Sequence, residues 1–254
     1  MMPGILQTRL QQGFRTMSWP DGPLPPLPDR FRGLPSLGDA DCPENCGACL
    51  GACPTGALHV ENGKAALDLG RCLFCGACAT ACGANRISFT AEHRLAAASR
   101  EALVVRPGDT GLPSRRVELA RKLFSRSLKL REVSAGGCNA CEADTNVLGT
   151  LAWDLGRFGI SFVASPRHAD GLLVTGPVPE NMHLALLKTW EAIPAPKICI
   201  AVGACAISGG PFAGHDEVHD GAGGLIPVDL FIPGCPPHPL TILDGLLALI
   251  GRIE

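Results

Sequence analysis

The chain has 254 residues and a formal net charge of −2, with 22 basic and 24 acidic side chains. This balance gives neither the basic stripe that binds nucleic acid nor the charge run of a disordered tail. A hydrophobic share of 46% allows two modest domains, and the longest apolar stretches fall well short of the ~18 residues of a membrane span. We expect a cytoplasmic protein, in which cysteines bind metal more often than they form disulfides.

Residues 1–36 predict a docking arm rather than a domain. A short amphipathic helix is expected over residues 5–16, and it lacks the continuous apolar run and cleavage site of a secretory signal. The prolines that follow, between Pro20 and Pro28, favour an extended chain. Such an arm would lie against a partner or against the protein itself.

Residues 37–90 contain an internal repeat built on two runs of four cysteines. The motif Cys-Gly-Ala-Cys that begins at Cys46 returns at Cys75, displaced by 29 residues. Between the two copies, Asn62-Gly63 predicts a tight hairpin turn between two short strands. Two copies of a unit too small to fold alone indicate a pseudo-symmetric module, whose cysteines are Cys42, Cys46, Cys49, Cys53, Cys72, Cys75, Cys78 and Cys82.

The spacing of these runs is typical of [4Fe-4S] ligation, in which three close thiolates share one cluster and the fourth cysteine reaches the other cluster. The alternative is a pair of zinc knuckles, but zinc sites usually show two paired cysteines per half. The first site then consists of Cys42, Cys46, Cys49 and Cys82. The second site consists of Cys53, Cys72, Cys75 and Cys78.

The first run departs from the usual spacing, because three residues rather than two separate Cys42 from Cys46. The longer loop could leave Cys42 unbound and the cluster with three irons. We favour a full four-iron cluster, since a loop absorbs one residue more easily than a site loses a thiolate. In the second run Gly83 follows Cys82, where the pattern has proline.

Residues 91–128 predict a connector, with glycine and proline breakers and a short helix over 119–128. Residues 129–254 alternate strand and helix signals, which favours a parallel α/β sheet. The expected strands are 130–134, 160–164, 171–175, 198–202 and 230–232. The expected helices are 146–158, 181–193 and 240–253.

A third set of cysteines is dispersed along this second region. Cys138, Cys205 and Cys235 each follow a predicted strand, and the functional crevice of an open α/β sheet lies at the carboxyl ends of its strands. With Cys141 they make a third set of four. Cys199 lies inside a predicted strand, where a free cysteine is expected to pack as a small apolar residue.

These motifs resemble two subunits of known complexes. The cysteine runs are similar to two-cluster bacterial ferredoxins and, more closely, to the ferredoxin-like subunit of complex I and of group 4 [NiFe] hydrogenases. That subunit also has an amphipathic helix and a segment like Asp29-Arg30-Phe31-Arg32-Gly33. Residues 128–142, 174–178, 202–210 and 232–237 resemble the small subunit of group 4 [NiFe] hydrogenases.

The resemblance implies an α+β two-[4Fe-4S] ferredoxin-like domain followed by a flavodoxin-like α/β domain shared with the complex I 20-kDa subunit. It implies that Cys138, Cys141, Cys205 and Cys235 form the third site, with a [4Fe-4S] cluster closest to the partner's reaction centre. Glu142, next to a ligand, is then a candidate for proton transfer. His238 and Asp144 depart from the pattern, which has arginine and commonly glutamate there.

The expected function is electron transfer through three [4Fe-4S] clusters in a complex I-like, membrane-associated [NiFe] hydrogenase or formate hydrogenlyase-type complex. The chain would be a non-autonomous oxidoreductase subunit, peripheral on the cytoplasmic face of the inner membrane, without catalytic residues of its own. Expected partners are the large subunit, membrane subunits and a soluble ferredoxin or formate dehydrogenase. The alternatives are an iron–sulfur subunit of an NADH:quinone oxidoreductase, a soluble ferredoxin-type carrier, and a zinc scaffold.

The spacing of two cysteines separates the hydrogenase-type subunit from the subunit of an NADH:quinone oxidoreductase. Complex I normally has the first two ligands of this cluster adjacent, whereas two residues separate Cys138 from Cys141. This spacing favours the hydrogenase branch.

Overall fold

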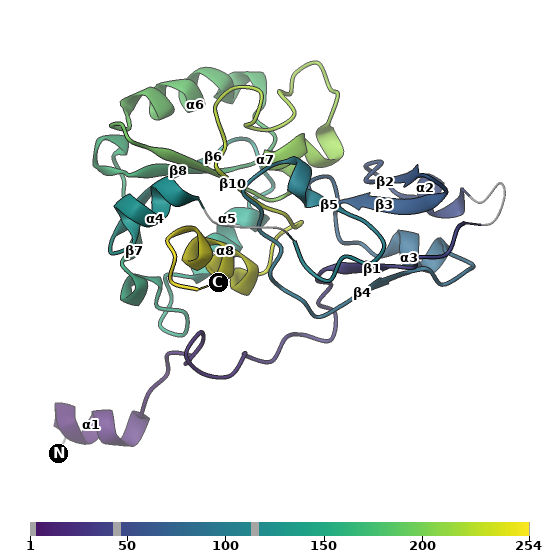
Figure 1. Ribbon diagram of the computed structural model, residues 1–254. Helices are drawn as coiled ribbons and strands as arrows, with labels where there is room; N and C mark the ends of the chain where they lie inside the picture. Colours follow the sequence, from purple (N-terminus) through teal and green to yellow (C-terminus); the bar gives the residue numbers. More distant parts are fainter. Residues whose placement is uncertain (1–3, 43–46, 113–116, 254) are drawn as a thin grey trace.

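A computed structural model describes residues 4–42, 47–112 and 117–253. The chain begins with α1 (Ile5–Gln12), which ends where Gly13 takes a positive φ of 63°. None of its residues is buried, and the helix projects from the rest of the molecule (Figure 1). The predicted N-terminal helix is therefore confirmed in a shorter form.

The rest of the arm lies against the protein's own α/β region. Trp19 is buried in the same apolar core as α8 (Pro239–Leu249). The guanidinium of Arg157 donates hydrogen bonds to the backbone carbonyls of Met17 (2.6 Å) and Trp19 (2.7 Å). These contacts fix the arm from about Thr16 onward and leave α1 without an intramolecular packing partner among the described residues.

The repeat region folds as two short sheets with two small helices. β1 (Pro35–Leu37) pairs antiparallel with β4 (Ile87–Phe89), and β2 (Leu58–Glu61) forms a hairpin with β3 (Lys64–Asp68). Asn62 and Gly63 take φ values of 50° and 80°, so the predicted Asn-Gly turn is confirmed. The helices α2 (Ala48–Ala52) and α3 (Ala77–Ala81) pack together, and the 29-residue displacement relates their bounds.

Residues 91–128 join the two regions through backbone pairing. After η1 (Glu101–Leu103), the two-residue strand β5 (Val104–Val105) extends the sheet of β2 and β3. Ala97 exchanges hydrogen bonds with Phe231 of β10 (Leu230–Ile232). α4 (Glu118–Phe124) follows, one residue before the start of the predicted helix, and ends four residues early.

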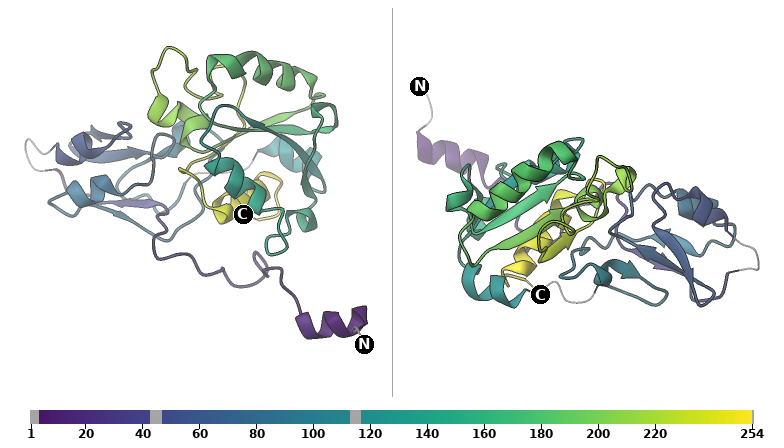
Figure 2. Two further views of the ribbon diagram at one scale, coloured as in Figure 1. Left: turned by 180° about the vertical axis from the view of Figure 1, so that it is seen from behind. Right: turned by 90° about the horizontal axis from the view of Figure 1, so that it is seen from above.

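The C-terminal region is a five-stranded parallel sheet with the flavodoxin-like order β10-β9-β8-β6-β7. α6 (Glu180–Ala192) covers one face, while α4 and α8 cover the other (Figure 1, Figure 2). Successive residues of β8 confirm the two faces, because Leu172 and Val174 belong to one core and Leu173 to the other. The remaining strands are β6 (Leu128–Ser134), β7 (Ile160–Phe162), β8 (Gly171–Thr175) and β9 (Ile198–Val202).

The predicted helix over residues 146–158 is wrong. The chain instead forms α5 (Ala140–Val147), then turns, then η2 (Leu155–Phe158). The Thr150 hydroxyl donates to the carbonyl of Val147 (2.7 Å), and Asp154 takes a positive φ of 47°, so the helical path is broken twice. The remaining short elements are η3 (Pro166–His168), α7 (Ala204–Ser208) and η4 (Gly210–Phe212).

One apolar core spans both regions. Ala206, Ile207 and Phe231 of the α/β region pack in a single buried set with Leu67 and Leu103 of the repeat and joining segments. The Ser208 hydroxyl also donates to the carbonyl of Gly70 (2.8 Å). Among the described helices, none is both long and apolar enough to cross a membrane.

Candidate metal centres

The third site lies at the carboxyl ends of the parallel strands. Cys138 and Cys141 follow β6, Cys205 lies on α7 directly after β9, and Cys235 follows β10. Burial raises the pKa of Cys205 to about 11, with further contributions from the charges of Cys235 and Cys138. Burial and the neighbouring Glu142, Cys205, Cys235 and Cys138 raise the pKa of Cys141 in the same way. The structure thus brings all four predicted residues within electrostatic reach of one another.

Two glycines leave room for the sulfur atoms of this site. A Cβ on Gly203 would lie 2.5 Å from the Sγ of Cys141, and a Cβ on Gly210 would lie 2.8 Å from the Sγ of Cys205. Both glycines also take a positive φ, 88° and 56°. Any larger residue would therefore displace a cysteine as well as strain the backbone.

The second site gathers Cys53, Cys72, Cys75 and Cys78 around a cavity that all four line together with apolar residues such as Leu67 and Phe89. Burial raises the pKa of Cys72 to about 12, and the charges of the other three add to it. Burial also raises the pKa of Cys78, whereas at Cys53 hydrogen bonds from Thr55 and Ala57 outweigh burial and lower the pKa. A cation that takes the place of the thiol protons would stabilise the thiolates of this partly buried set. This donor set fits a metal group.

Only part of the first site is described, because Cys46 lies outside the described residues. Cys49 is buried on α2, Cys82 caps α3, and the N–H of Cys42 donates to the carbonyl of Gly63 (3.0 Å).

The internal repeat is also visible in the backbone hydrogen bonds to the cysteine sulfur atoms. The Ala57 N–H donates to the Sγ of Cys53 (3.2 Å), and at the equivalent position the Arg86 N–H donates to the Sγ of Cys82 (3.3 Å). The same kind of backbone hydrogen bond therefore supports one cysteine of each N-terminal site.

The spacing of the cysteines argues against single zinc ions. Sulfur ligands of one zinc lie about 3.8 Å apart, given Zn–S bonds of about 2.3 Å in a tetrahedron. In the part of the chain that the structure describes, no three cysteine Sγ atoms lie within 4.8 Å of one another. Nor does a disulfide join two of the described cysteines. A wider, multinuclear group suits these sites better.

The second and third sites face each other. The charge of Cys75 contributes, after burial and Cys138, to the raised pKa of Cys235. A pocket between them is lined by Phe74 and Arg32 from one side and by Cys235 and His238 from the other. The Arg32 guanidinium donates to the Phe74 carbonyl (3.3 Å), and the Phe31 ring packs on His238 with centroids 5.5 Å apart. Asp144 lines the same pocket.

Glu142 is held in a defined position beside the third site. The hydroxyls of Ser134 and Thr175 each donate to its Oε1 at 2.6 Å. Burial alone would raise the pKa of Glu142, but these hydrogen bonds outweigh it and the pKa is lowered.

A second carboxylate, Glu132, was missed from the sequence because it lies within a strand. Burial and the negative charge of Glu142 raise its pKa to about 7. Its Oε1 is buried without a hydrogen-bond partner in the described structure, and the two glutamates line a common cavity with Asn146. A carboxyl group that titrates near neutral pH therefore stands next to the site.

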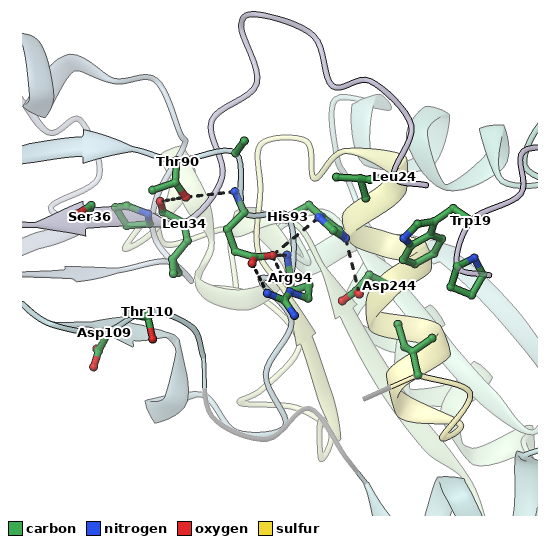
Figure 3. A pocket seen from close by; sticks show the side chains of 15 residues that line it. Trp19, Leu24, Leu34, Ser36, Thr90, His93, Arg94, Asp109, Thr110 and Asp244 are labelled. Carbon is green, nitrogen blue, oxygen red and sulfur yellow. Dashed lines mark hydrogen bonds and ion pairs between the residues drawn. The ribbon is translucent and has the colours of Figure 1, made fainter. Parts of the chain in front are cut away.

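A groove of about 780 Å³ has no cysteine among its described lining residues. Figure 3 shows His93 there between Asp244 of α8 and Arg94. The His93 Nε2 lies 3.9 Å from Asp244, and its Nδ1 lies 3.8 Å from Glu92. Hydrogen bonds from Arg94 lower the pKa of Glu92 to about 2, so this carboxylate stays charged at neutral pH.

Two further residues singled out in the sequence have defined places in the structure. Cys199 is fully buried within β9, which confirms its expected place in the core. His238 caps α8, where its Nδ1 accepts a hydrogen bond from the Leu240 N–H (3.1 Å).

Sheet order and cysteine placement define a flavodoxin-like α/β domain with four cysteines at the carboxyl ends of its strands, and sequence comparison identifies the family. The family model described as NADH ubiquinone oxidoreductase, 20 Kd subunit, matches residues 138–249. This match contains all four cysteines of the third site and neither N-terminal run.

Three relatives agree with it. Formate hydrogenlyase subunit 7 of Escherichia coli (strain K12) is 42% identical over 146 residues, which cover 58% of this chain and 57% of that protein. The probable membrane-bound hydrogenase subunit mbhJ of Pyrococcus furiosus is 41% identical, over 55% of this chain and 83% of its own. An NADH-quinone oxidoreductase subunit of Clostridium beijerinckii is 42% identical, over 46% of this chain and 70% of its own.

The chain belongs to the family of the 20-kDa subunit of NADH:ubiquinone oxidoreductase, as the resemblance predicted. It spans little more than half the length of the formate hydrogenlyase subunit that it matches.

Proposed function

We propose that this chain is the iron–sulfur electron-transfer subunit of a complex I-like, membrane-associated [NiFe] hydrogenase or formate hydrogenlyase-type complex. Residues 37–90 would form a ferredoxin-like domain with the first and second sites, and residues 129–254 the domain with the third site. The connector would be residues 91–128. Bound [4Fe-4S] clusters would supply one-electron transfer between these sites.

The observation that carries the proposal is that the second and third sites adjoin one pocket, lined by Phe74 and Cys235, and that the charge of Cys75 acts on Cys235 across the two regions. These residues belong to different sites and lie 160 positions apart in the sequence. This electrostatic influence supports a linear arrangement in which the second site mediates between the first and the third. The shared core and the Ser208–Gly70 hydrogen bond would hold that spacing constant.

The surroundings of the third site support a role at a partner's reaction centre. Cys138 and Cys235 are exposed, whereas Cys141 and Cys205 of the same site are partly buried. A cluster held there would lie at the protein surface, where a large subunit could approach it. Glu142 and Glu132 would then be the groups of this chain that hold or pass protons beside it.

The relatives support both hydrogenase and quinone reductase assemblies. The two-residue separation of Cys138 and Cys141 favours the hydrogenase type, and an NADH:quinone oxidoreductase subunit is the second candidate. A soluble ferredoxin-type carrier is disfavoured by α1, whose Ile5, Leu6 and Leu10 are all exposed. We propose that this arm docks on a partner subunit or on the cytoplasmic face of the inner membrane.

Two measurements test the proposal. Three [4Fe-4S] clusters require about twelve irons and twelve acid-labile sulfides per chain after anaerobic purification. Isolation of the intact complex should also yield a large subunit that carries the [NiFe] cysteine pairs. An iron content near four would overturn the three-cluster assignment, and a large subunit without those pairs would favour the quinone reductase.

A further inference from the structure

Three residues with metal-binding side chains meet outside the cysteine sites. Glu180 and His183 lie on the first turn of α6, and His219 lies on the long segment between η4 and β10. Their ligand atoms all lie within 4.8 Å of one another, and no other group of three in the described part of the chain does so. We refer to these three residues as the histidine clip.

The clip has the geometry of an open three-ligand site. One carboxylate oxygen of Glu180 lies 2.6 Å from the Nε2 of His219 and 3.8 Å from the Nδ1 of His183. In a tetrahedral zinc site, ligand atoms lie about 3.4 Å apart, given bonds of about 2.0–2.1 Å. The two observed distances fall on either side of this value, so small side-chain rotations would complete the arrangement.

Backbone hydrogen bonds already hold the two segments together. The His219 N–H donates to the carbonyl of Val178 (3.0 Å), and the Glu180 N–H donates to the carbonyl of Glu217 (3.0 Å). Pro179 and Val218 form an antiparallel bridge between these bonds. Because the backbone is fixed, the ligands lose little further freedom when an ion binds.

A plain ion pair explains the clip less well than a metal site. His219 and Glu180 alone could form such a pair, but the His183 ring lies only 4.3 Å from the His219 ring, centroid to centroid. The His183 Nδ1 and the His219 Nε2 thus both face the same carboxylate, and a divalent cation is the group that uses all three ligand atoms at once. The positive end of α6 disfavours a cation, and the Glu180 carboxylate offsets this effect.

We propose that Glu180, His183 and His219 bind a borderline divalent transition-metal ion, of which Zn²⁺ is the type. Imidazole nitrogens and a carboxylate are suitable ligands for this ion, and a solvent molecule would take the fourth position. The histidine side chains are 30% and 28% exposed, which gives the ion a path of entry. The ion would fasten residues 209–229 to α6, and this segment joins α7 with Cys205 to β10 before Cys235.

The site can be tested on the anaerobically purified protein with its native iron. Zinc and iron are measured per chain after equilibrium dialysis against buffered Zn²⁺, for the natural protein, His183→Ala, His219→Ala and the exposed control His168→Ala. We expect one zinc per chain in the natural protein and in His168→Ala. Each clip variant should bind it more than about 100-fold more weakly, since even outer partners of a metal site are worth 10–100-fold.

A second measurement reports the fastening of the segment. Glu217 is exposed, so a glutamate-specific protease should cut there, and Zn²⁺ should slow this cut at least ~10-fold in the natural protein but not in His183→Ala. Zinc X-ray absorption should give nitrogen and oxygen ligands. The proposal is overturned if zinc binds equally well to the clip variants, if its ligands are sulfur, or if the natural protein takes up no equivalent of zinc.

Discussion

The repeat region and the α/β region both gather cysteines, but they do so by different means. In the repeat region, two five-residue helices and short spacers carry the cysteines, and backbone amides point at Cys53 and Cys82. In the α/β region, Cys138 and Cys235 lie 97 positions apart in the sequence. They meet only because their strands are parallel and end at the same edge.

The glycines next to the cysteines show what this difference means. In the repeat, a Cβ on Gly47, Gly51 or Gly83 would meet nothing within 4 Å, and a Cβ on Gly76 would meet the flexible side chain of Arg32 at 2.8 Å rather than a cysteine. In the α/β region, a Cβ on Gly203 or Gly210 would collide with a cysteine sulfur. The local sites therefore depend on cysteine spacing, whereas the dispersed site depends on the close packing of the sheet edge.

The largest effect is expected from Cys235→Ser, which removes one ligand of the third site. Iron should fall from about twelve to about eight per chain, and electron delivery to the large subunit should stop. The signals of the first and second sites should remain in electron paramagnetic resonance, because their ligands all precede residue 83.

Cys199→Ala is the matched control, because Cys199 is a fully buried cysteine outside the three sites. It should keep all three signals and cost about 1 kcal/mol of stability as a small core deletion. If Cys199→Ala removed a cluster and Cys235→Ser spared it, the ligand assignment would be wrong.

Gly203→Ala against Gly51→Ala tests the contrast between the regions directly. At Gly203 the new methyl group meets the Cys141 sulfur and the backbone has a positive φ, so a loss of about 2–4 kcal/mol is expected. The third-site signal should weaken while iron in the other sites is kept. Gly51→Ala should leave stability unchanged or raise it by up to about 1 kcal/mol, because Gly51 lies in α2 and its Cβ would meet nothing. Equal effects of the two substitutions would remove the distinction between the regions.

The sequence predicted most of this architecture because its signals were local. The Asn62-Gly63 turn and the strands around Leu172 and Ile200 follow from short-range patterns, and the structure confirms them. The helix expected over 146–158 failed because Thr150 and Asp154 redirect the backbone through polar and left-handed conformations that apolar periodicity does not record.

The candidate sites show the same limit. Cysteine spacing predicted the four residues of the second site, which line one cavity, and the family resemblance predicted those of the third. The electrostatic influence of Cys75 on Cys235 depends instead on how the two regions pack. Glu132 was missed for a similar reason. A single glutamate in a strand has no pattern of its own, and only the tertiary structure places it beside Glu142.

The arm provides a third test, because its two parts contact the protein differently. Deleting residues 1–15 removes α1, which buries none of its residues, so stability should change by less than about 0.5 kcal/mol and all iron should remain. The truncated chain should no longer co-purify with its complex. Trp19→Ala should instead cost about 3 kcal/mol, since this side chain is buried in the core. Full co-purification after the deletion would contradict a docking role for α1.

The smallest effect concerns the pH dependence of stability at Glu132. Its pKa is raised to about 7 in the folded protein, above the usual glutamate value of about 4.3. The folded state therefore binds more protons than the unfolded state between these values, and the free energy of unfolding falls as pH rises from about 4.5 to about 7.

The substitution Glu132→Gln removes this loss of stability with rising pH. The variant should match the natural protein near pH 4.5 and exceed it by about 1 kcal/mol at pH 8, after allowance for solvent screening. Thermal unfolding of both proteins at a fixed scan rate across this range measures the difference, and Glu118→Gln on the exposed side of α4 serves as the control. A difference that does not grow with pH would mean that the carboxyl group of Glu132 is solvated in the folded protein, and that the α/β region holds no second titrating group beside Glu142.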